Sequence, residues 1–270
     1  MARFRLGCNT VLFGMVEVEE ALQHIAWAGY DGAELAALPQ MADHLRTGQG
    51  TDYARRLRGR TADLGLDLFA IEAATADPAR LDAVLQTASE LEVPVVAIGS
   101  GGRTGDEESF RQVIALGAQL AEMAGRYGVR LTMKPHVGAA VYNTETALRA
   151  WRTIGSPHLG LNFDPSHLHR AGEDVAAAAR RFGAAGAIVH CHFRDCPARE
   201  PKASPGPPER QVPGRSELDI PGVLRALAES GYAGAVDLEV IGARQYPLSR
   251  AMGIAAEARG YLHRCLQEFG

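Results

Sequence analysis

The sequence predicts an α/β fold, namely a single-domain closed (β/α)₈ barrel (TIM barrel) that spans residues 1–270. Two observations support this prediction. Short apolar segments alternate with helical patterns along the chain, which is typical of a parallel sheet. Eight such units in about 250 residues fit a closed barrel better than an open sheet. A doubly wound open sheet is the alternative, but no glycine-rich phosphate turn follows the first strand.

The eight predicted strands share a local pattern, in which a helix ends at a glycine or a short turn and a brief apolar run follows. Glycine stops a helix at low cost because it readily adopts the left-handed conformation. The segments with these turns and strands are FRLGC (4–8), WAGYDGAEL (27–35), DLGLDLFAI (63–71), ELEVPVVAI (90–98), RYGVRLTMK (126–134), GSPHLGLNF (155–163), GAAGAIVHC (183–191) and SGYAGAVDL (230–238). Helices are predicted at 18–28, 53–64, 78–90, 107–127, 144–154, 175–182, 220–230 and 248–269.

Residues 196–218 interrupt this alternation, because the segment CPAREPKASPGPPERQVPGRSEL contains six prolines. So many prolines exclude a long helix and a central strand. The segment follows the seventh strand and would lie on the C-terminal face of a barrel. It is either a lid that contacts substrate or a disordered insertion.

The composition and charge of the chain limit the kinds of molecule that it is expected to bind. A net charge of -4 and a pI near 6.1 argue against nucleic acid and anionic membranes. The chain has no run of 18 apolar residues and no signal-peptide pattern at its start. Cys8, Cys191, Cys196 and Cys265 lack the spacing of a disulfide framework or a zinc ribbon. We therefore expect a cytoplasmic protein with reduced thiols and a small-molecule substrate.

Four predicted strands in the second half of the chain each end in two polar residues that are two positions apart. The pairs are Thr132 and Lys134, Asn162 and Asp164, His190 and His192, and Asp237 and Glu239. Residues two apart on a strand point to the same face. Catalytic groups of a barrel lie where its strands end. We therefore expect these pairs to converge on one polar site.

Asp164, His192 and Glu239 are candidate metal ligands within this set. Two carboxylates and an imidazole suit a divalent ion such as manganese, zinc, cobalt or iron. Three protein ligands leave positions open for substrate oxygens, and the ion would polarise a carbonyl. Each residue also has a structural alternative, since an aspartate before proline is commonly a helix cap and a glutamate can pair with an arginine.

These residues resemble, in type and order, those of the xylose isomerase-like barrel superfamily, and the resemblance covers nearly the whole chain. That group includes sugar isomerases and epimerases, inosose dehydratase and enzymes of the endonuclease IV type. The matching features are Asp164-x-x-His167, His192-x-x-Asp195, the strand-ending Glu239, GYDGAEL with Glu34, and ELDIPGVLRALAESGYAGAVDLE (217–239).

The resemblance implies a metal held by Glu, Asp, His and Glu from strands five to eight. Asp164, His192 and Glu239 match three of these ligands, but strand five ends in Lys134. Three accounts are open. In the first, the ammonium of Lys134 replaces part of the metal's role. In the second, the metal stays on three ligands, with help from His136 or His190, and Lys134 binds or protonates the substrate. In the third, the site is degenerate and inactive.

Lys134, His136, Glu239 and Glu34 are the catalytic candidates, with Glu72 as a weaker acid–base candidate. In a dry pocket the pKa of Lys134 would fall below about 10.4, and the residue could then act as a base. In the structural alternative, Lys134 is paired with Glu34, Asp164 or Glu239. The resemblance gives His167 a substrate contact. Arg194, which follows His192, would bind an anionic or hydroxylated substrate.

The resemblance implies an isomerase or epimerase that uses a divalent metal to move a proton next to a carbonyl of a sugar, keto-sugar or cyclitol. A metal-dependent dehydratase or lyase on a keto-sugar is the first alternative, and a non-catalytic sugar-binding barrel is the second. An endonuclease IV-like phosphodiesterase is the third, which the negative net charge disfavours. The resemblance also implies a homo-oligomer, either a dimer or a tetramer.

Overall fold

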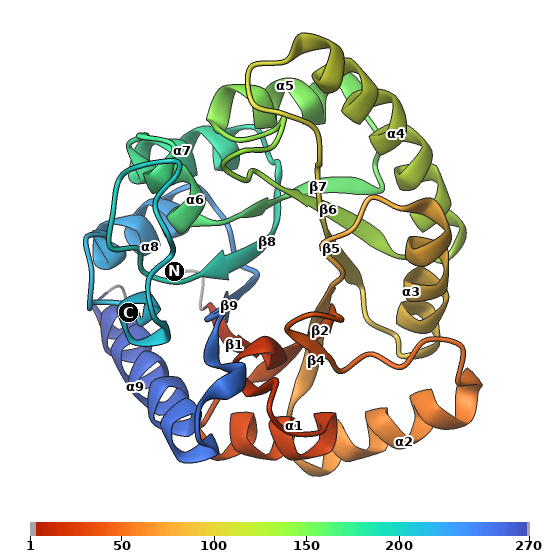
Figure 1. Ribbon diagram of the computed structural model, residues 1–270, viewed down its shortest axis with the longest axis vertical. Helices are drawn as coiled ribbons and strands as arrows, with labels where there is room; N and C mark the ends of the chain where they lie inside the picture. Colours follow the sequence, from red (N-terminus) through yellow and green to blue (C-terminus); the bar gives the residue numbers. More distant parts are fainter. Residues whose placement is uncertain (1–3, 269–270) are drawn as a thin grey trace.

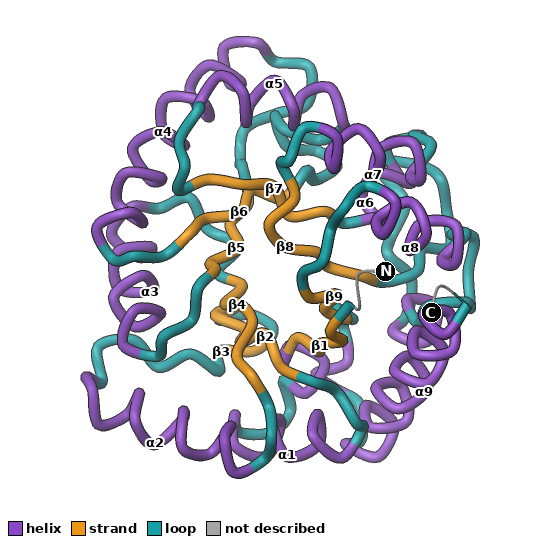
Figure 2. The backbone as a smooth tube through the Cα atoms, turned by 180° about the vertical axis from the view of Figure 1, so that it is seen from behind, coloured by secondary structure: helices purple, strands orange, loops and turns teal. Residues whose placement is uncertain are grey.

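The computed structural model describes residues 4–268, and their strands form a closed barrel with helices around it (Figure 1; Figure 2). Parallel strands follow one another in the order β1-β9-β8-β7-β6-β5-β4-β2, and a pairing of β1 with β2 closes the ring. The strands are β1 (Arg5–Asn9), β2 (Gly32–Leu38), β4 (Asp67–Glu72), β5 (Val95–Gly99), β6 (Arg130–Lys134), β7 (Leu159–Phe163), β8 (Ile188–Phe193) and β9 (Ala235–Leu238). The predicted (β/α)₈ barrel is confirmed, and the doubly wound alternative is wrong.

The long helices lie outside the strands in Figure 1 and match the predicted ranges to within a few residues. The largest difference is at α2, which begins at Gly50 instead of residue 53. The predicted end of the last helix at Phe269 lies outside the described residues. The helices are α1 (Val18–Trp27), α2 (Gly50–Asp63), α3 (Pro78–Glu90), α4 (Glu107–Arg126), α5 (Thr144–Ile154), α7 (Val175–Ala184), α8 (Ile220–Glu229) and α9 (Leu248–Gln267).

Short polar residues explain where several helices begin. The side chain of Asp77 accepts a hydrogen bond from the backbone of Arg80 at the start of α3. Asn143 does the same for Thr146 at the start of α5, where the two residues form a capping box. Such caps satisfy backbone N–H groups that have no partner within the helix.

Five short elements were not predicted, and all lie in connections between the main elements. They are β3 (Ala42–Asp43), α6 (Pro165–Arg170) and the 3₁₀ helices η1 (Thr10–Phe13), η2 (Pro208–Gln211) and η3 (Ala243–Gln245). Helix α6 matters most for the site, because it begins directly after β7. Asp164 is its N-cap and accepts hydrogen bonds from the backbone and hydroxyl of Ser166. The expected role of Asp164 as a helix cap is therefore confirmed.

The polar pairs at the strand ends lie opposite a buried apolar layer, as expected. The residues between the members of each pair, Met133, Phe163, Cys191 and Leu238, are at most 2% exposed. Phe163 packs edge-on against Phe182 of α7, with ring centroids 6.0 Å apart. Apolar side chains thus face the helices, which leaves the alternate positions for the barrel interior.

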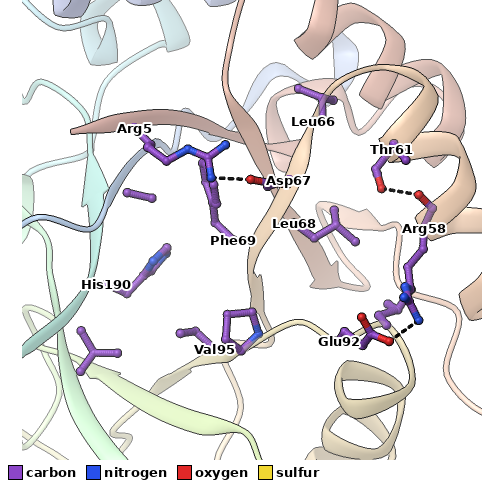
Figure 3. A pocket seen from close by; sticks show the side chains of 15 residues that line it. Arg5, Arg58, Thr61, Leu66, Asp67, Leu68, Phe69, Glu92, Val95 and His190 are labelled. Atoms are coloured by element: carbon purple, nitrogen blue, oxygen red, sulfur yellow. Dashed lines mark hydrogen bonds and ion pairs between the residues drawn. The ribbon is translucent and has the colours of Figure 1, made fainter. Parts of the chain in front are cut away.

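Glycines make room for large side chains at the N-terminal end of the barrel. A Cβ on Gly7 would lie 1.5 Å from Asp237 Oδ1, and one on Gly32 would lie 2.5 Å from the ring of Phe69. A cavity of about 530 Å³ opens at this end, and His190 is among its lining residues (Figure 3). His190 also contacts Glu34, so it connects this cavity with the polar interior.

The proline-rich segment 196–218 is ordered by one buried carboxylate. Asp195 accepts hydrogen bonds from the backbone N–H groups of Cys196, Gly214, Ser216 and Leu218 at 2.8–3.1 Å. The interpretation of this segment as a disordered insertion is wrong, because Asp195 anchors it.

The four cysteines are all buried and unpaired. Burial raises the pKa of the Cys8 and Cys191 thiols well above the ordinary value, which fits their interpretation as small hydrophobic residues. Among residues 4–268, no helix is both long and apolar enough to cross a bilayer.

Candidate active site

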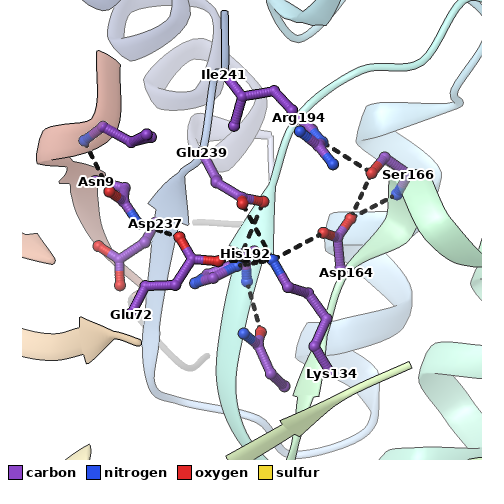
Figure 4. Close-up of polar contacts among 12 residues, drawn as sticks. Asn9, Glu72, Lys134, Asp164, Ser166, His192, Arg194, Asp237, Glu239 and Ile241 are labelled. Atoms are coloured by element: carbon purple, nitrogen blue, oxygen red, sulfur yellow. Dashed lines mark hydrogen bonds and ion pairs between the residues drawn. The ribbon is translucent and has the colours of Figure 1, made fainter. Parts of the chain in front are cut away.

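Polar side chains from the C-terminal ends of the barrel strands meet in one buried group, which we call the barrel-mouth cluster (Figure 4). None of its members is more than 7% exposed. The cluster comprises Asn9 on β1, Glu34 on β2, Glu72 on β4, Lys134 on β6, Asp164 after β7, His192 on β8 and Glu239 after β9. Six of the seven are ionisable, and at such burial each charge needs a partner.

Lys134 lies at the centre of the cluster. Its Nζ is 3.0 Å from Glu72 Oε1, 2.9 Å from His192 Nδ1 and 3.1 Å from Glu239 Oε1. Asp164 Oδ2 is farther away, at 3.8 Å. An ammonium has three N–H donors, so each donor of Lys134 has one acceptor.

Glu34 forms a second layer behind His192. Its carboxylate lies 2.7 Å from His192 Nε2 and 3.1 Å from His190 Nε2. Asn9 donates from Nδ2 to both Glu34 and Glu72, at 2.7 and 2.8 Å. The proton of His192 is thereby favoured on Nε2, which leaves Nδ1 as the acceptor for Lys134.

Arg194 and His167 border the cluster on the α6 side. Arg194 donates from Nε to Ser166 Oγ at 3.0 Å, and its Nη2 lies 3.1 Å from His167 Nε2. Both residues are buried. Asp164 Oδ2 has no hydrogen-bond partner and lies 3.7 Å from His167 Nε2. These groups can therefore bind the hydroxyls of a polar substrate.

Burial raises the pKa of carboxyl groups, and the neighbouring charges in the cluster oppose this rise to different degrees. Burial raises the pKa of Glu72 to about 7, and the neighbouring Glu239 reinforces this effect, while Lys134 opposes it. Burial alone would raise the pKa of Glu239, but Lys134 and Arg194 hold it well below the ordinary value. Glu72 thus has a pKa near neutrality, which suits a general acid, and burial likewise raises the pKa of Asp237 to about 7.

The pKa of Lys134 is shifted in the direction opposite to the predicted one. Burial alone would lower this pKa, but Glu239, Glu72 and Asp164 outweigh burial and raise it above the ordinary value. The prediction of a lowered pKa is wrong because these three carboxylates together outweigh burial. Lys134 is therefore a fixed cation and not a free base, and the predicted pairing with Glu239 and Asp164 is confirmed.

The cluster contains donor groups of the kind that bind divalent ions. Glu72, His192 and Glu239 each place one ligand atom within 4.8 Å of the others, and so do Glu34, His190 and His192. Asp164 belongs to neither group, although the sequence predicted it as a ligand. In the first group, however, the space between the donors holds the Lys134 ammonium, which contacts all three. The donor types suit a metal, whereas the space that they surround is filled.

The structure places the predicted site residues at different distances from this centre. Lys134, His192 and Glu239 touch one another, and Asp164 borders them. Glu34 reaches the centre through His192 and, by way of Asn9, through Glu72. His136 lies at the exposed edge, where its ring stacks on His167 with centroids 3.9 Å apart. The catalytic roles of these residues stay predictions.

The sequence analysis did not predict an important role for two members of the cluster. Glu72 was only a weak candidate, and Asn9 was not singled out. Both are the last residues of their strands, β4 and β1. The same signal that marked the later strands, a polar residue at the strand end, was present at both positions.

Comparisons with known proteins agree with this geometry. Residues 22–265 match the family model described as xylose isomerase-like TIM barrel. The chain is 26% identical to an inosose isomerase of Halalkalibacterium halodurans over 171 residues, which are 62% of this chain and 60% of that protein. It is 27% identical to an inosose dehydratase of Lacticaseibacillus casei over 170 residues, 58% of this chain and 54% of that protein. The chain thus matches little more than half the length of these two relatives.

A solved structure of the protein IOLI with a zinc atom superimposes with a TM-score of 0.78 at 18% identity, covering 96% of this chain and 98% of that one. This likeness concerns the fold alone. The match to the family model, in contrast, includes the strands from β2 to β9. The chain therefore belongs to the xylose isomerase-like TIM barrel family.

Proposed function

We propose that this protein is an isomerase or epimerase that moves a proton next to the carbonyl of a keto-sugar or a keto-cyclitol. One observation carries the proposal: a buried cation, Lys134, lies within 3.1 Å of two carboxyl groups, Glu72 and Glu239. Proton abstraction beside a carbonyl needs both parts, since a base takes the proton while positive charge stabilises the enolate oxygen. The named inosose isomerase among the relatives supports the choice of substrate class.

The roles of the residues follow from their contacts. The ammonium of Lys134 and the guanidinium of Arg194 face the position of the carbonyl oxygen and stabilise its developing charge. Glu239, whose pKa is held low, accepts the proton from carbon, and the electron pair moves to the carbonyl oxygen. Glu72, with a pKa of about 7, returns a proton to the opposite face of the same carbon, which gives the epimer. For the isomer it protonates the former carbonyl carbon instead, while the proton of the neighbouring hydroxyl moves to the enolate oxygen and the carbonyl forms at the neighbouring carbon. His167 and Arg194 bind the hydroxyls.

A divalent ion such as manganese, zinc, cobalt or iron would supply the same polarisation of the carbonyl. Glu72, Asp164, His192 and Glu239 would hold it, provided that the Lys134 ammonium had left the space between them. No step above depends on such an ion.

We infer that substrate reaches the cluster past the proline-rich segment. Gln211 of this segment is 1% exposed, and its Oε1 accepts a hydrogen bond from the backbone of Ile241 and lies 3.5 Å from Arg194 Nη1. A cavity of about 280 Å³ adjoins Gln211 and Ile241. These contacts support a lid that opens to admit substrate and then excludes water.

A dehydratase is the second candidate, because it begins with the same proton abstraction. The enolate would then expel a hydroxyl group from the neighbouring carbon as water, with the proton supplied by Glu72, while Arg194 and His167 hold that hydroxyl. The inosose dehydratase among the relatives favours this variant.

The test is exchange of the carbon-bound proton in heavy water, followed by proton NMR on a panel of inososes and ketohexoses. We expect the active substrate to lose its signal beside the carbonyl, and we expect Glu239→Gln to slow this exchange by about 10²–10⁴-fold. Glu122→Gln, on the exposed face of α4, is the matched control and should exchange at the normal rate. Full exchange with Glu239→Gln would contradict the assignment, and a new vinylic signal would identify the dehydratase.

A further inference from the structure

We propose that the ammonium of Lys134 is the resident cation of the barrel-mouth cluster and takes the place of a divalent ion there. The inference rests on the proposed function for its chemical purpose, but its evidence is the geometry alone. It concerns which positive charge the site uses, and it predicts that the native protein retains no metal at this position.

The first argument is the fit of the ammonium. Lys134 Nζ makes contacts of 2.9, 3.0 and 3.1 Å with His192, Glu72 and Glu239, which are ordinary lengths for charge-assisted hydrogen bonds. Ligands of zinc lie much closer to the ion, at about 2.0–2.2 Å. The donors therefore surround the nitrogen at the spacing that hydrogen bonds require.

The second argument is the cost of displacing the ammonium. Lys134 is 7% exposed, and its charge interacts with Glu72, Glu239 and Asp164 at once. A divalent ion between the same donors would lie within contact distance of a like charge. Lys134 would have to leave, and a buried ammonium without these carboxylates is strongly disfavoured.

The third argument is the way in which a partner of the ammonium is held. Glu72, at the end of β4, supplies a carboxylate that bonds to Lys134 from elsewhere in the barrel. Asn9 holds the other oxygen of Glu72 at 2.8 Å and so fixes its orientation. The cluster thus contains a partner suited to an ammonium and a device that positions it.

This arrangement changes how the site stabilises an enolate. The ammonium offers N–H donors to the substrate oxygen, which would replace one of the three present acceptors. A substrate carbonyl is then stabilised by a charged hydrogen bond and not by coordination to a Lewis acid. The neighbouring Arg194, also buried, adds a second fixed positive charge.

The test measures metal content by plasma mass spectrometry after dialysis against manganese, zinc or cobalt, followed by desalting. The variants are Lys134→Glu, which restores a carboxylate, and Lys134→Met, which removes only the charge. Lys202→Met is the matched control, because Lys202 lies exposed in the proline-rich segment. We expect the native protein and the control to retain no metal, and Lys134→Glu to retain about one equivalent. Circular dichroism on each variant shows whether it is folded.

One equivalent of metal retained by the native protein would overturn the inference. A second measurement uses the native protein alone: a chelator should leave the rate of proton exchange on the substrate unchanged. If the chelator abolished activity and added metal restored it, the inference would also be overturned. Gain of metal by Lys134→Glu without any activity of the native protein would support the resident cation and contradict the proposed function. The two hypotheses therefore fail separately.

Discussion

At the scale of single residues, Glu34 is the group on which the orientation of two histidines depends. Attraction to His192 and His190, together with their hydrogen bonds, outweighs burial and lowers the pKa of Glu34. Asn9 donates to the same carboxylate. The carboxylate therefore accepts from three donors at a position with no exposed surface, so a change of this group must alter several contacts at once.

We expect Glu34→Gln to lower the free energy of unfolding by about 3–5 kcal/mol, because the amide removes the negative charge and turns an NH₂ group toward other donors. Urea denaturation measures the loss. Glu122→Gln is the control and should change stability by no more than about 0.5 kcal/mol. Equal stability of Glu34→Gln and the native protein would show that Glu34 does not hold the histidine rings.

The sequence identified most of these residues but not their pairings. Polar side chains two apart on a strand point the same way, so the convergence of Lys134, Asp164, His192 and Glu239 followed from local spacing. The contact between Lys134 and Glu72 joins strands that are 62 positions apart in sequence. Spacing along one strand carries no information about such a contact, and for this reason the direction of the Lys134 pKa shift was predicted wrongly.

At the scale of elements, the proline-rich segment is held by Asp195 and not by its own secondary structure. We expect Asp195→Ala to leave four backbone N–H groups without their acceptor and to lower stability by about 2–4 kcal/mol. Trypsin should then cut more rapidly at Arg199 and Lys202, because the segment opens more often. Limited proteolysis with mass spectrometry measures this rate.

Glu200→Ala is the matched control for this experiment, since Glu200 lies exposed in the same segment. Its proteolysis should follow the native rate. If Asp195→Ala were cut no faster than this control, the segment would have to be ordered by its other contacts, such as those of Arg170 with Pro201 and Ala203.

The elements that sequence analysis missed are shorter than the patterns on which it relies. Helix α6 has six residues, fewer than two turns, so no apolar period is visible in it. Strand β3 has two residues and exists only through its antiparallel pairing with β2. The long helices were found because their apolar faces repeat over several turns and their starts carry capping residues such as Asp77.

At the scale of the whole molecule, closure of the barrel requires glycine where large groups cross its interior. We expect Gly7→Ala to destabilise the protein by about 1–3 kcal/mol, because the new Cβ would overlap with Asp237 and approach Phe69 to 2.9 Å. Thermal unfolding measures the effect. Gly59→Ala is the contrasting control, since its Cβ in α2 would meet nothing within 4 Å and alanine favours a helix by up to about 1 kcal/mol.

A melting temperature of Gly7→Ala at or above the native value would show that the interior can absorb the methyl group.

The barrel itself was predictable for a simple reason. Each unit of helix, turn and strand is a local pattern, and eight units in this length favour closure. The contents of the interior were not predictable, because Phe69, Gly7 and Gly32 meet only when β1, β2 and β4 pair.

The pairing of β1 with both β2 and β9 has a consequence for the order of folding. Arg5 lies beside Ala235 in the closed ring, so the first strand finds its second partner near the other end of the chain. During synthesis, β1 can pair with β2 early but keeps an open edge until β9 has been made. Contacts over such a span form slowly, because the ends of a long chain must meet first. The barrel-mouth cluster, which needs Glu239 after β9, is consequently assembled among the last parts of the molecule.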